Sequence, residues 1–299
     1  MMVKDAFEAF ILEKRVNGLS PRSIEAYRWH CLPLIRAHGE AQIEDLTQPE
    51  IYRVVLDVLD GSLAKASQSS YIRSTRIFLR WCSMEYPVKY RYEKVRVPRS
   101  PKKKIRVYTD DELLMIFGAV PGHPEWIRLR NAALIAVFFD SGIRRTEACA
   151  LRRSDLDLQR GRFTVTGKGN KQRLASIGEA ARLFVRRYLA ACPFDSEYVF
   201  VSIKGCRLTP NAVSQMTHDL QRRLPFELSP HKLRHNFATN YCLDKYAAGE
   251  QVDPLLLKVI MGHEDLVTTQ KYLHLALEMV AVEKKVSALD KKLGDIRPP

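Results

Sequence analysis

The segment His231-Lys232-Leu233-Arg234-His235 holds a proton-transfer group and a phosphate-binding group three residues apart. On a helix, positions i and i+3 share a face, so His231 and Arg234 can reach one target together. Arginine is suited to a bidentate grip on phosphate, and histidine exchanges protons near neutral pH. The spacing therefore predicts a site that binds a phosphate and moves a proton beside it.

A second arginine follows a glycine turn in Ser141-Gly142-Ile143-Arg144. Glycine permits another backbone to approach closely at such a turn. Glu147 lies three positions after Arg144 and can orient its guanidinium, but a surface ion pair of small worth has the same spacing. Taken alone, this motif is more typical of a structural ion pair than of a catalytic arginine.

Two further segments place a lysine and a histidine at turns. Lys168 lies between two short runs that are typical of β-strands, so a hairpin turn can present it. A turn lysine can reach a phosphate and act as a general acid if its pKa is lowered, although most such lysines are merely exposed. Lys171 on the same loop is a competitor. His263 follows Gly262 at the start of another helix, where an anion can bind or the imidazole can simply pack.

Tyr272 lies nine residues after His263, within a predicted helix. A phenol can act as a nucleophile when a base stands beside it. Most helical tyrosines are core or surface aromatics, and Tyr241 and Tyr246 are nearby alternatives. Spacing alone leaves the choice open.

The composition favours a polyanionic partner. The chain has 299 residues, 46% of them hydrophobic, with a formal net charge of +14 and a pI of about 9.6. The hydrophobic fraction excludes a disordered polyelectrolyte, and the charge fits nucleic acid or an acidic membrane surface, although a merely basic protein has the same balance. The longest apolar run, Ala132 to Phe139, is too short to span a bilayer, and no N-terminal signal region is evident. We expect a cytoplasmic protein with no membrane association.

The six cysteines form no CxxC pair, and none has metal-ligand spacing from a histidine pair. Reduced and mostly buried thiols are therefore predicted. The sequence also offers no clear carboxylate cluster for Mg²⁺. We expect no metal site and no cofactor.

Residues 1–88 are predicted to form a domain of short helices. Ser20 and Pro21 are typical of a helix start, because serine caps the first turn and proline fits the first helical position. A last helix, residues 67–84, carries a basic stripe that could track a DNA backbone or could equally be a solvated face. The stripe consists of Arg73, Arg76 and Arg80.

Residues 89–107 are predicted to form a basic linker that is kept extended by Pro98 and Pro101. The run Lys102, Lys103 and Lys104 lies near its end. Such a linker could follow phosphates as two domains close around a duplex, or serve only as a solvated tether.

Residues 108–299 are predicted to form a larger mixed α+β domain, so the fold class is mainly α with a small β-hairpin. The strands are expected at 163–166 and 173–177, with the Lys168 turn between them. We also expect an amphipathic helix at 275–293, which could pack on its own domain.

Five segments of the second domain resemble the catalytic domain of the tyrosine recombinases, also called the phage integrase family. These segments are Ser-Gly-Ile-Arg-Arg-Thr-Glu, Gly-Lys-Gly-Asn-Lys-Gln-Arg, His-Lys-Leu-Arg-His, Met-Gly-His and Thr-Thr-Gln-Lys-Tyr-Leu-His. Each is loose alone, but together they keep the family's order and gaps over residues 108 to 275. Residues 1–88 resemble, more weakly, the family's SAM-like core-binding domain. The whole is similar to Xer-type recombinases and mobile-element integrases. The stretch 244–253 is longer than the family's pattern, so we expect an extra loop there. The resemblance also implies that the helix at 275–293 could dock on a neighbouring protomer instead of its own domain.

The resemblance implies a role for each of these residues. Tyr272 is the expected nucleophile, which forms a 3′-phosphotyrosine link to DNA. Arg144 and Arg234 are expected to hold the non-bridging oxygens of the scissile phosphate. His231 is expected to take the tyrosine proton, and Lys168 to protonate the 5′-hydroxyl that leaves.

Two supporting roles complete the implied site, in which His263 hydrogen-bonds the phosphate and Glu147 supports Arg144. The implied activity is site-specific recombination of double-stranded DNA by integration, excision or resolution, without metal or ATP. Because four strands must break, we expect a homotetramer on two DNA sites, with a possible accessory protein or second recombinase. The protein should be nucleoid-associated when bound to DNA. The alternatives are a type IB topoisomerase and a DNA-binding regulator with an inactive site.

Overall fold

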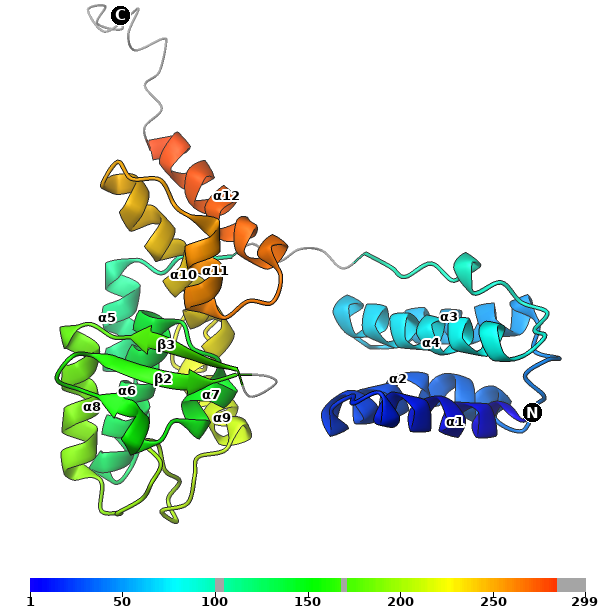
Figure 1. Cartoon of the computed structure of the whole chain (residues 1–299), viewed down its shortest axis with the longest axis horizontal. Coiled ribbons are helices and arrows are strands. Elements are labelled where there is room, and N and C mark those ends of the chain that lie inside the picture. The colour runs from blue at the N-terminus through cyan, green and yellow to red at the C-terminus, as the bar shows by residue number, and fades with distance from the viewer. Residues whose placement is uncertain (100–104, 168–170, 284–299) are drawn as a thin grey trace, which may run out of the picture. The chain divides into compact units, whose positions relative to one another are not determined.

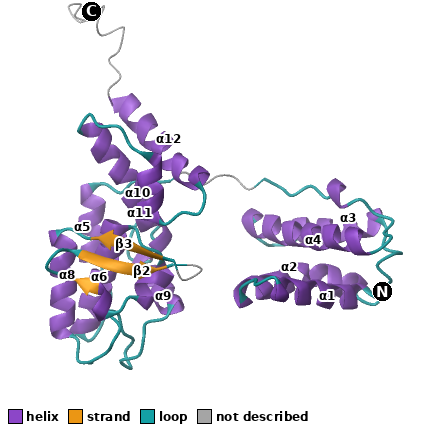
Figure 2. Cartoon of the chain, in the orientation of Figure 1, coloured by secondary structure: helices purple, strands orange, loops and turns teal. Residues whose placement is uncertain are grey.

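The structure is a computed structural model that describes residues 1–99, 105–167 and 171–283 of the chain. It divides into two compact units, Met1–Lys103 and Lys104–Pro299. Most described residues are helical, and the strands form one small antiparallel sheet (Figure 2). The prediction of a mainly α chain with a small β-hairpin is confirmed.

The first unit is built from four helices whose apolar faces share one core (Figure 1). Phe7, Phe10 and Ile11 follow helical spacing and are buried together. The predicted helix start at Ser20 is confirmed, because its side-chain oxygen accepts the backbone N–H of Ser23 at 3.2 Å. The helices are α1 (Val3–Val16), α2 (Pro21–His38), α3 (Gln48–Asp60) and α4 (Lys65–Glu85).

Part of the segment predicted as a linker packs on this core. The 3-10 helix η1 (Tyr92–Lys94) lies within it, and Tyr90 and Val95 on either side are buried. The Tyr90 hydroxyl donates to the Leu79 carbonyl at 3.1 Å, and the Ser69 hydroxyl donates to the Pro98 carbonyl at 2.8 Å. The reason is composition: the basic residues of this stretch alternate with aromatic and β-branched residues that can be buried.

The basic stripe on α4 is only partly accessible. Arg73 and Arg80 are exposed, whereas Arg76 is half-buried. Lys102, Lys103 and Lys104 lie outside the described residues. A role of these six residues in DNA binding stays a prediction.

The second unit combines helices with the three-stranded sheet. The order of the strands is β1-β2-β3, and the hairpin pairs Phe163 with Ala175 and Val165 with Arg173. β1 is too short, at two residues, for any alternation to reveal it in the sequence. The elements are α5 (Asp110–Gly118), α6 (Glu125–Ser141), α7 (Arg145–Ala150), η2 (Arg153–Asp155), β1 (Leu156–Asp157), β2 (Arg162–Thr166), β3 (Gln172–Ser176), α8 (Glu179–Ala191), α9 (Pro210–Gln221), α10 (Pro230–Ala247), α11 (Pro254–Met261) and α12 (Leu266–Glu283).

Helix α6 is the centre of the main core of this unit. Every residue from Ala132 to Phe138 is buried, and the helix packs against both α8 and α10. Its apolar run therefore belongs to a buried core helix, as its length suggested. Among the described residues, no helix combines the length and apolarity needed to cross a membrane.

Helices α10, α11 and α12 share a second apolar cluster (Figure 1). Two expectations are corrected here. The predicted loop at 244–253 starts later, because α10 continues to Ala247. No separate helix begins near residue 275, because α12 runs without a break from Leu266 to Glu283 and buries Ala276. Residues 284–299 lie outside the described part.

The six cysteines are free, and four of them are buried, as predicted. Among the described residues, no group of three His, Cys, Asp or Glu side chains is placed to hold a metal ion.

Candidate active site

Two arginines from distant parts of the sequence meet near the end of α6. Gly142 ends this helix with a left-handed backbone, φ 60°, and Arg144 is the N-cap residue of α7, which begins at Arg145. Arg234 lies in the first turns of α10 and donates to the Gly142 carbonyl at 2.5 Å. The sequence predicted close approach of another backbone at Gly142, but the aromatic ring of Phe237 fills this place. A side chain on α10 therefore requires the glycine.

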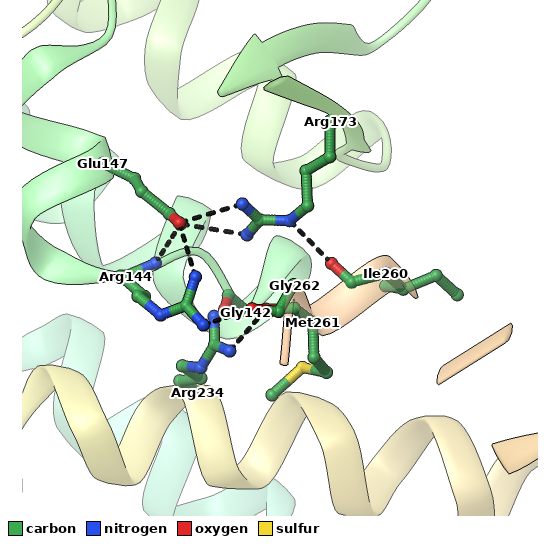
Figure 3. A network of polar contacts seen from close by, with 8 residues as sticks. All are labelled: Gly142, Arg144, Glu147, Arg173, Arg234, Ile260, Met261 and Gly262. Carbon is green, nitrogen blue, oxygen red and sulfur yellow. Dashed lines mark hydrogen bonds and ion pairs between the residues drawn. The ribbon is translucent and has the colours of Figure 1, made fainter. Parts of the chain in front are cut away.

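Glu147 is the anionic centre of the arginine cluster (Figure 3). Its carboxylate accepts the Arg144 backbone N–H at 2.7 Å and the Arg144 Nη1 at 2.8 Å. Arg173 on β3 donates through both Nη atoms to the two Glu147 oxygens, each at 2.9 Å. Although burial alone raises it, these hydrogen bonds hold the pKa of Glu147 below its ordinary value of 4.5. The spacing that suggested a surface ion pair thus belongs to a buried one.

The last turn of α11 supplies three successive carbonyls to three guanidiniums (Figure 3). Arg173 Nε donates to Ile260 at 3.0 Å, Arg234 Nη2 donates to Met261 at 2.5 Å, and Arg144 Nη2 donates to Gly262. Carbonyls at the C-terminal end of a helix carry partial negative charge, so they suit this cationic cluster. Each of the three guanidiniums is therefore fixed by a hydrogen bond to the end of α11.

The arginines open onto a cavity of about 730 Å³. Arg144, Arg234, His231 and His263 all line it, together with side chains of α9. The Arg144 side chain is 38% exposed and Arg234 is buried. Burial, followed by the charge of Arg144, lowers the pKa of Arg234 to about 10, so its guanidinium stays charged at neutral pH. The cavity therefore presents two fixed positive charges and two imidazoles, which is suited to a phosphate.

Both imidazoles at the cavity are neutral at neutral pH. Burial and then Lys271 and Arg234 lower the pKa of His231, so it can accept a proton. Burial and then Arg234 lower the pKa of His263 to about 4. Nδ1 of His263 shares a hydrogen bond of 2.9 Å with the buried Thr269 hydroxyl, which fixes its ring.

Tyr272 lies behind this cavity rather than in it. Its side chain is 1% exposed, and its ring stacks on His263 with centroids 6.1 Å apart. Its hydroxyl shares a hydrogen bond of 2.6 Å with Nδ1 of His235, not with His231. Burial raises the pKa of Tyr272 to about 12. In this conformation the phenol is neutral, is bonded to His235 and does not line the cavity.

His231 and His235 lie one turn apart on α10, with ring centroids 4.0 Å apart. Burial and then His231 lower the pKa of His235 to about 3, so this imidazole is uncharged near pH 7. Of these two neighbouring imidazoles, His231 lines the cavity and His235 is bonded to the Tyr272 hydroxyl.

The structure brings five of the six predicted catalytic side chains, and Glu147, into one region. The sixth, Lys168, lies outside the described residues. Its competitor Lys171 is exposed and lines a second cavity of about 300 Å³, together with Arg144 and His263. Of the alternative tyrosines, Tyr241 and Tyr246 are half-buried against the cluster of α10 to α12.

Comparison with known proteins identifies this arrangement. The model of the phage integrase family matches residues 106–279, which hold all of the described site. The chain belongs to the phage integrase family.

Two relatives span nearly the whole of this integrase-family chain. A protein named tyrosine recombinase XerC, from Alcanivorax borkumensis, is 28% identical over 88% of this chain and 86% of its own. Tyrosine recombinase XerA from Thermococcus kodakarensis is 25% identical over 98% of both chains. Both names confirm the resemblance to Xer-type recombinases.

Solved structures share the fold of this integrase. A crystal structure of XerA recombinase superposes with a TM-score of 0.52 and 24% identity, covering 95% of this chain and 99% of its own. A lambda integrase dimer bound to a COC′ core site reaches 0.70 at 18% identity, covering 91% and 95%. Likeness at this level of identity concerns the fold alone.

Sequence reasoning missed three residues of this integrase site. Arg173 was assigned to a strand and ended one of the family-like segments but was given no role, and no short-range spacing links it to Glu147. His235 was quoted beside His231 but given no role, although its i+4 position on the same helix face was a usable signal. Lys271 lies 5.0 Å from the centre of the Tyr272 ring and adds positive charge beside the histidines.

Proposed function

We propose that this protein is a site-specific DNA recombinase that cleaves and rejoins strands through a 3′-phosphotyrosine on Tyr272. The observation that carries the proposal is the shared cavity of Arg144, Arg234, His231 and His263, with Tyr272 packed against its wall. Two guanidiniums and two neutral imidazoles suit a phosphodiester, and a tyrosine one side-chain movement away suits transesterification.

The chemistry follows from these charges. The Tyr272 oxygen attacks the phosphorus while its proton passes to His231, and the bond from phosphorus to the 5′ oxygen breaks. Negative charge grows on the non-bridging oxygens, where Arg144 and Arg234 stabilise it, and a donor of this kind is typically worth about 100-fold or more in rate. The leaving 5′ oxygen takes a proton from Lys168. Attack by a 5′-hydroxyl reverses each step, so the energy of the bond is conserved.

Tyr272 must first leave His235. In the free protein its phenol is buried, so cleavage requires a conformational step that brings it to His231. We infer that binding of DNA supplies this step, because a phosphate can compete with the α11 carbonyls for Arg144 and Arg234. The free enzyme is thereby kept from reacting without its target.

The remaining parts of the proposal concern partners. We propose double-stranded DNA as the partner, with the first unit as a core-binding domain and the second as the catalytic domain. The net charge of +14 and solved relatives captured on DNA support this. Four strands have to be broken, so we propose a homotetramer on two DNA sites. An accessory protein or a second recombinase is a further candidate partner. We expect the protein in the cytoplasm, bound to the nucleoid.

The test is capture of the covalent intermediate. Protein is incubated with fragments of the DNA that flanks its gene, and the reaction is stopped with detergent. The fragment retained is then rebuilt as a duplex nicked next to the cleavage position, so that the released strand diffuses away. We expect an adduct whose DNA is blocked at the 3′ end by the protein, and a released strand with a free 5′-hydroxyl.

Matched tyrosine variants identify the nucleophile. Tyr272→Phe should abolish the adduct while sequence-specific DNA binding survives, whereas Tyr241→Phe and Tyr246→Phe should leave it intact. An adduct that persists in Tyr272→Phe would remove this nucleophile. Relaxation of supercoiled DNA without site preference would favour a topoisomerase, and binding without any adduct would favour an inactive regulator.

A further inference from the structure

Arg173 has an unusual position for a charged residue of this chain. Its side chain is 11% exposed, and it uses Nη1, Nη2 and Nε for contacts within the protein. It lies on β3, whereas its partners Glu147 and Ile260 belong to α7 and α11 (Figure 3). Arg173 does not line the 730 Å³ cavity that Arg144 and Arg234 share, although it lines the neighbouring 300 Å³ cavity with Arg144.

We propose that Arg173 is a positioning residue of the phosphate-binding site, which fixes Glu147 against Arg144 and ties both to the end of α11. This inference rests on the proposed function, because it assigns a task within the same reaction. Arg173 does not contact the phosphate; it acts through the residues that do.

The first support is the geometry of the carboxylate. Arg173 contacts both oxygens of Glu147, one through each Nη, and this bidentate contact defines the plane of the carboxylate. Oε1 then faces Arg144 Nη1 and Oε2 faces the Arg144 backbone N–H. Without Arg173, the Glu147 carboxylate would keep only its two contacts with Arg144, and its plane would be less firmly fixed. The guanidinium that meets the phosphate would lose its fixed direction.

The second support is the contact with α11. Arg173 Nε holds the Ile260 carbonyl, and a side chain added at Gly262 would lie 3.0 Å from the same Nε atom. Gly262 directly precedes His263 and accepts a hydrogen bond from Arg144. A single guanidinium therefore links the strand to the segments that carry Arg144 and His263.

The third support is electrostatic. Arg144 and Arg173 are paired with Glu147, and Arg234 lies near enough to interact with all three charges; a buried cation near two others is costly. A shape-matched apolar residue would avoid that cost if the task were packing alone. A largely buried Arg173 that also fixes the direction of the Arg144 guanidinium suits a catalytic site, because misplacing such a group by about 1 Å can cost about 100-fold in rate.

The experiment measures adduct formation by Arg173→Gln on the nicked duplex. The first-order rate constant is followed at saturating DNA, together with the amplitude, the dissociation constant and the midpoint of thermal unfolding. We expect the rate constant to fall about 10- to 100-fold while DNA affinity changes little. A merely structural loss would lower the amplitude, which counts active molecules, and leave the rate constant of those molecules unchanged.

Three comparisons sharpen the result. Arg160→Gln removes the same charge from the turn between β1 and β2, where Arg160 forms an exposed pair with Asp157, 3.6 Å apart, and it should react at the wild-type rate. Arg173→Lys keeps the charge without the bidentate contact and should stay well below wild type. The double variant Arg173→Gln/Glu147→Gln should be no slower than the slower single variant, because both act as one unit.

A substrate with an uncharged methylphosphonate at the scissile position gives a separate readout. Arg144 has less charge to stabilise on this linkage, so the ratio of wild-type to Arg173→Gln rates should move towards one. An Arg173→Gln rate constant equal to wild type, or an unchanged ratio on methylphosphonate, would overturn the inference while wild-type activity upholds the proposed function. Absence of an adduct in wild type would overturn both.

Discussion

Replacing Gly142 by alanine should strongly destabilise the second unit. Gly142 has φ 60° and an added Cβ would lie 2.3 Å from Cδ1 of Phe237. The left-handed backbone costs about 1–2 kcal/mol for a residue with a Cβ. Overpacking against the ring adds about 1–3 kcal/mol. The sum is about 2–5 kcal/mol, which for a unit of this size lowers the unfolding midpoint by about 10 °C.

Gly249 separates the two contributions. It also has a positive φ, 74°, but nothing lies within 4 Å of its added Cβ. Gly249→Ala should therefore show only the backbone cost, about 1–2 kcal/mol. In a Phe237→Ala background, Gly142→Ala should fall to the same value, because the clashing ring is gone.

Denaturant unfolding followed by circular dichroism measures these free energies. Hydrogen exchange of peptides from α6 and α10 assigns the loss to the second unit rather than the first. Equal free-energy losses for Gly142→Ala and Gly249→Ala would refute the packing argument. A Gly142→Ala loss that survives removal of the Phe237 ring would refute it as well.

Three other predictions follow from the charges of the site. The pKa of Glu147 is below 4.5 in the folded state, so the ionised carboxylate stabilises the fold above pH 4.5, and this stabilisation is lost as the pH falls through the folded pKa. The difference in unfolding free energy between wild type and Glu147→Gln should therefore shrink in acid. At subsaturating DNA, the rate of adduct formation should fall with a midpoint below pH 6.5 as His231 becomes protonated, and His231→Gln should lack this acid limb. DNA affinity measured by anisotropy should fall steeply with salt, and Arg73→Gln should reduce the log–log slope by about one if the α4 stripe meets phosphate. A flat salt response, or a slope that Arg73→Gln leaves unchanged, would contradict the last expectation.

The sequence by itself determined the elements and the chemical inventory of the site. Local signals such as the Ser20 cap, the apolar run of α6 and the two strand segments of the hairpin depend on nearby residues, so they can be recognised without the tertiary structure. The His231–Arg234 pair was readable for the same reason, because i and i+3 on one helix always share a face. Element ends were less certain: α10 runs past the predicted start of the 244–253 loop, and α12 begins at Leu266, before the predicted start at 275.

Only the tertiary structure decided how the site is held and which groups touch. Arg173 meets Glu147 across 26 positions of sequence, and Tyr272 meets His235 across 37, so no local pattern specifies either contact. The buried state of the Tyr272 phenol likewise depends on the packing of α12 against α10. Residue types limit what chemistry is possible, but distances, burial and the resulting pKa values arise when distant helices and a strand pack around one carboxylate.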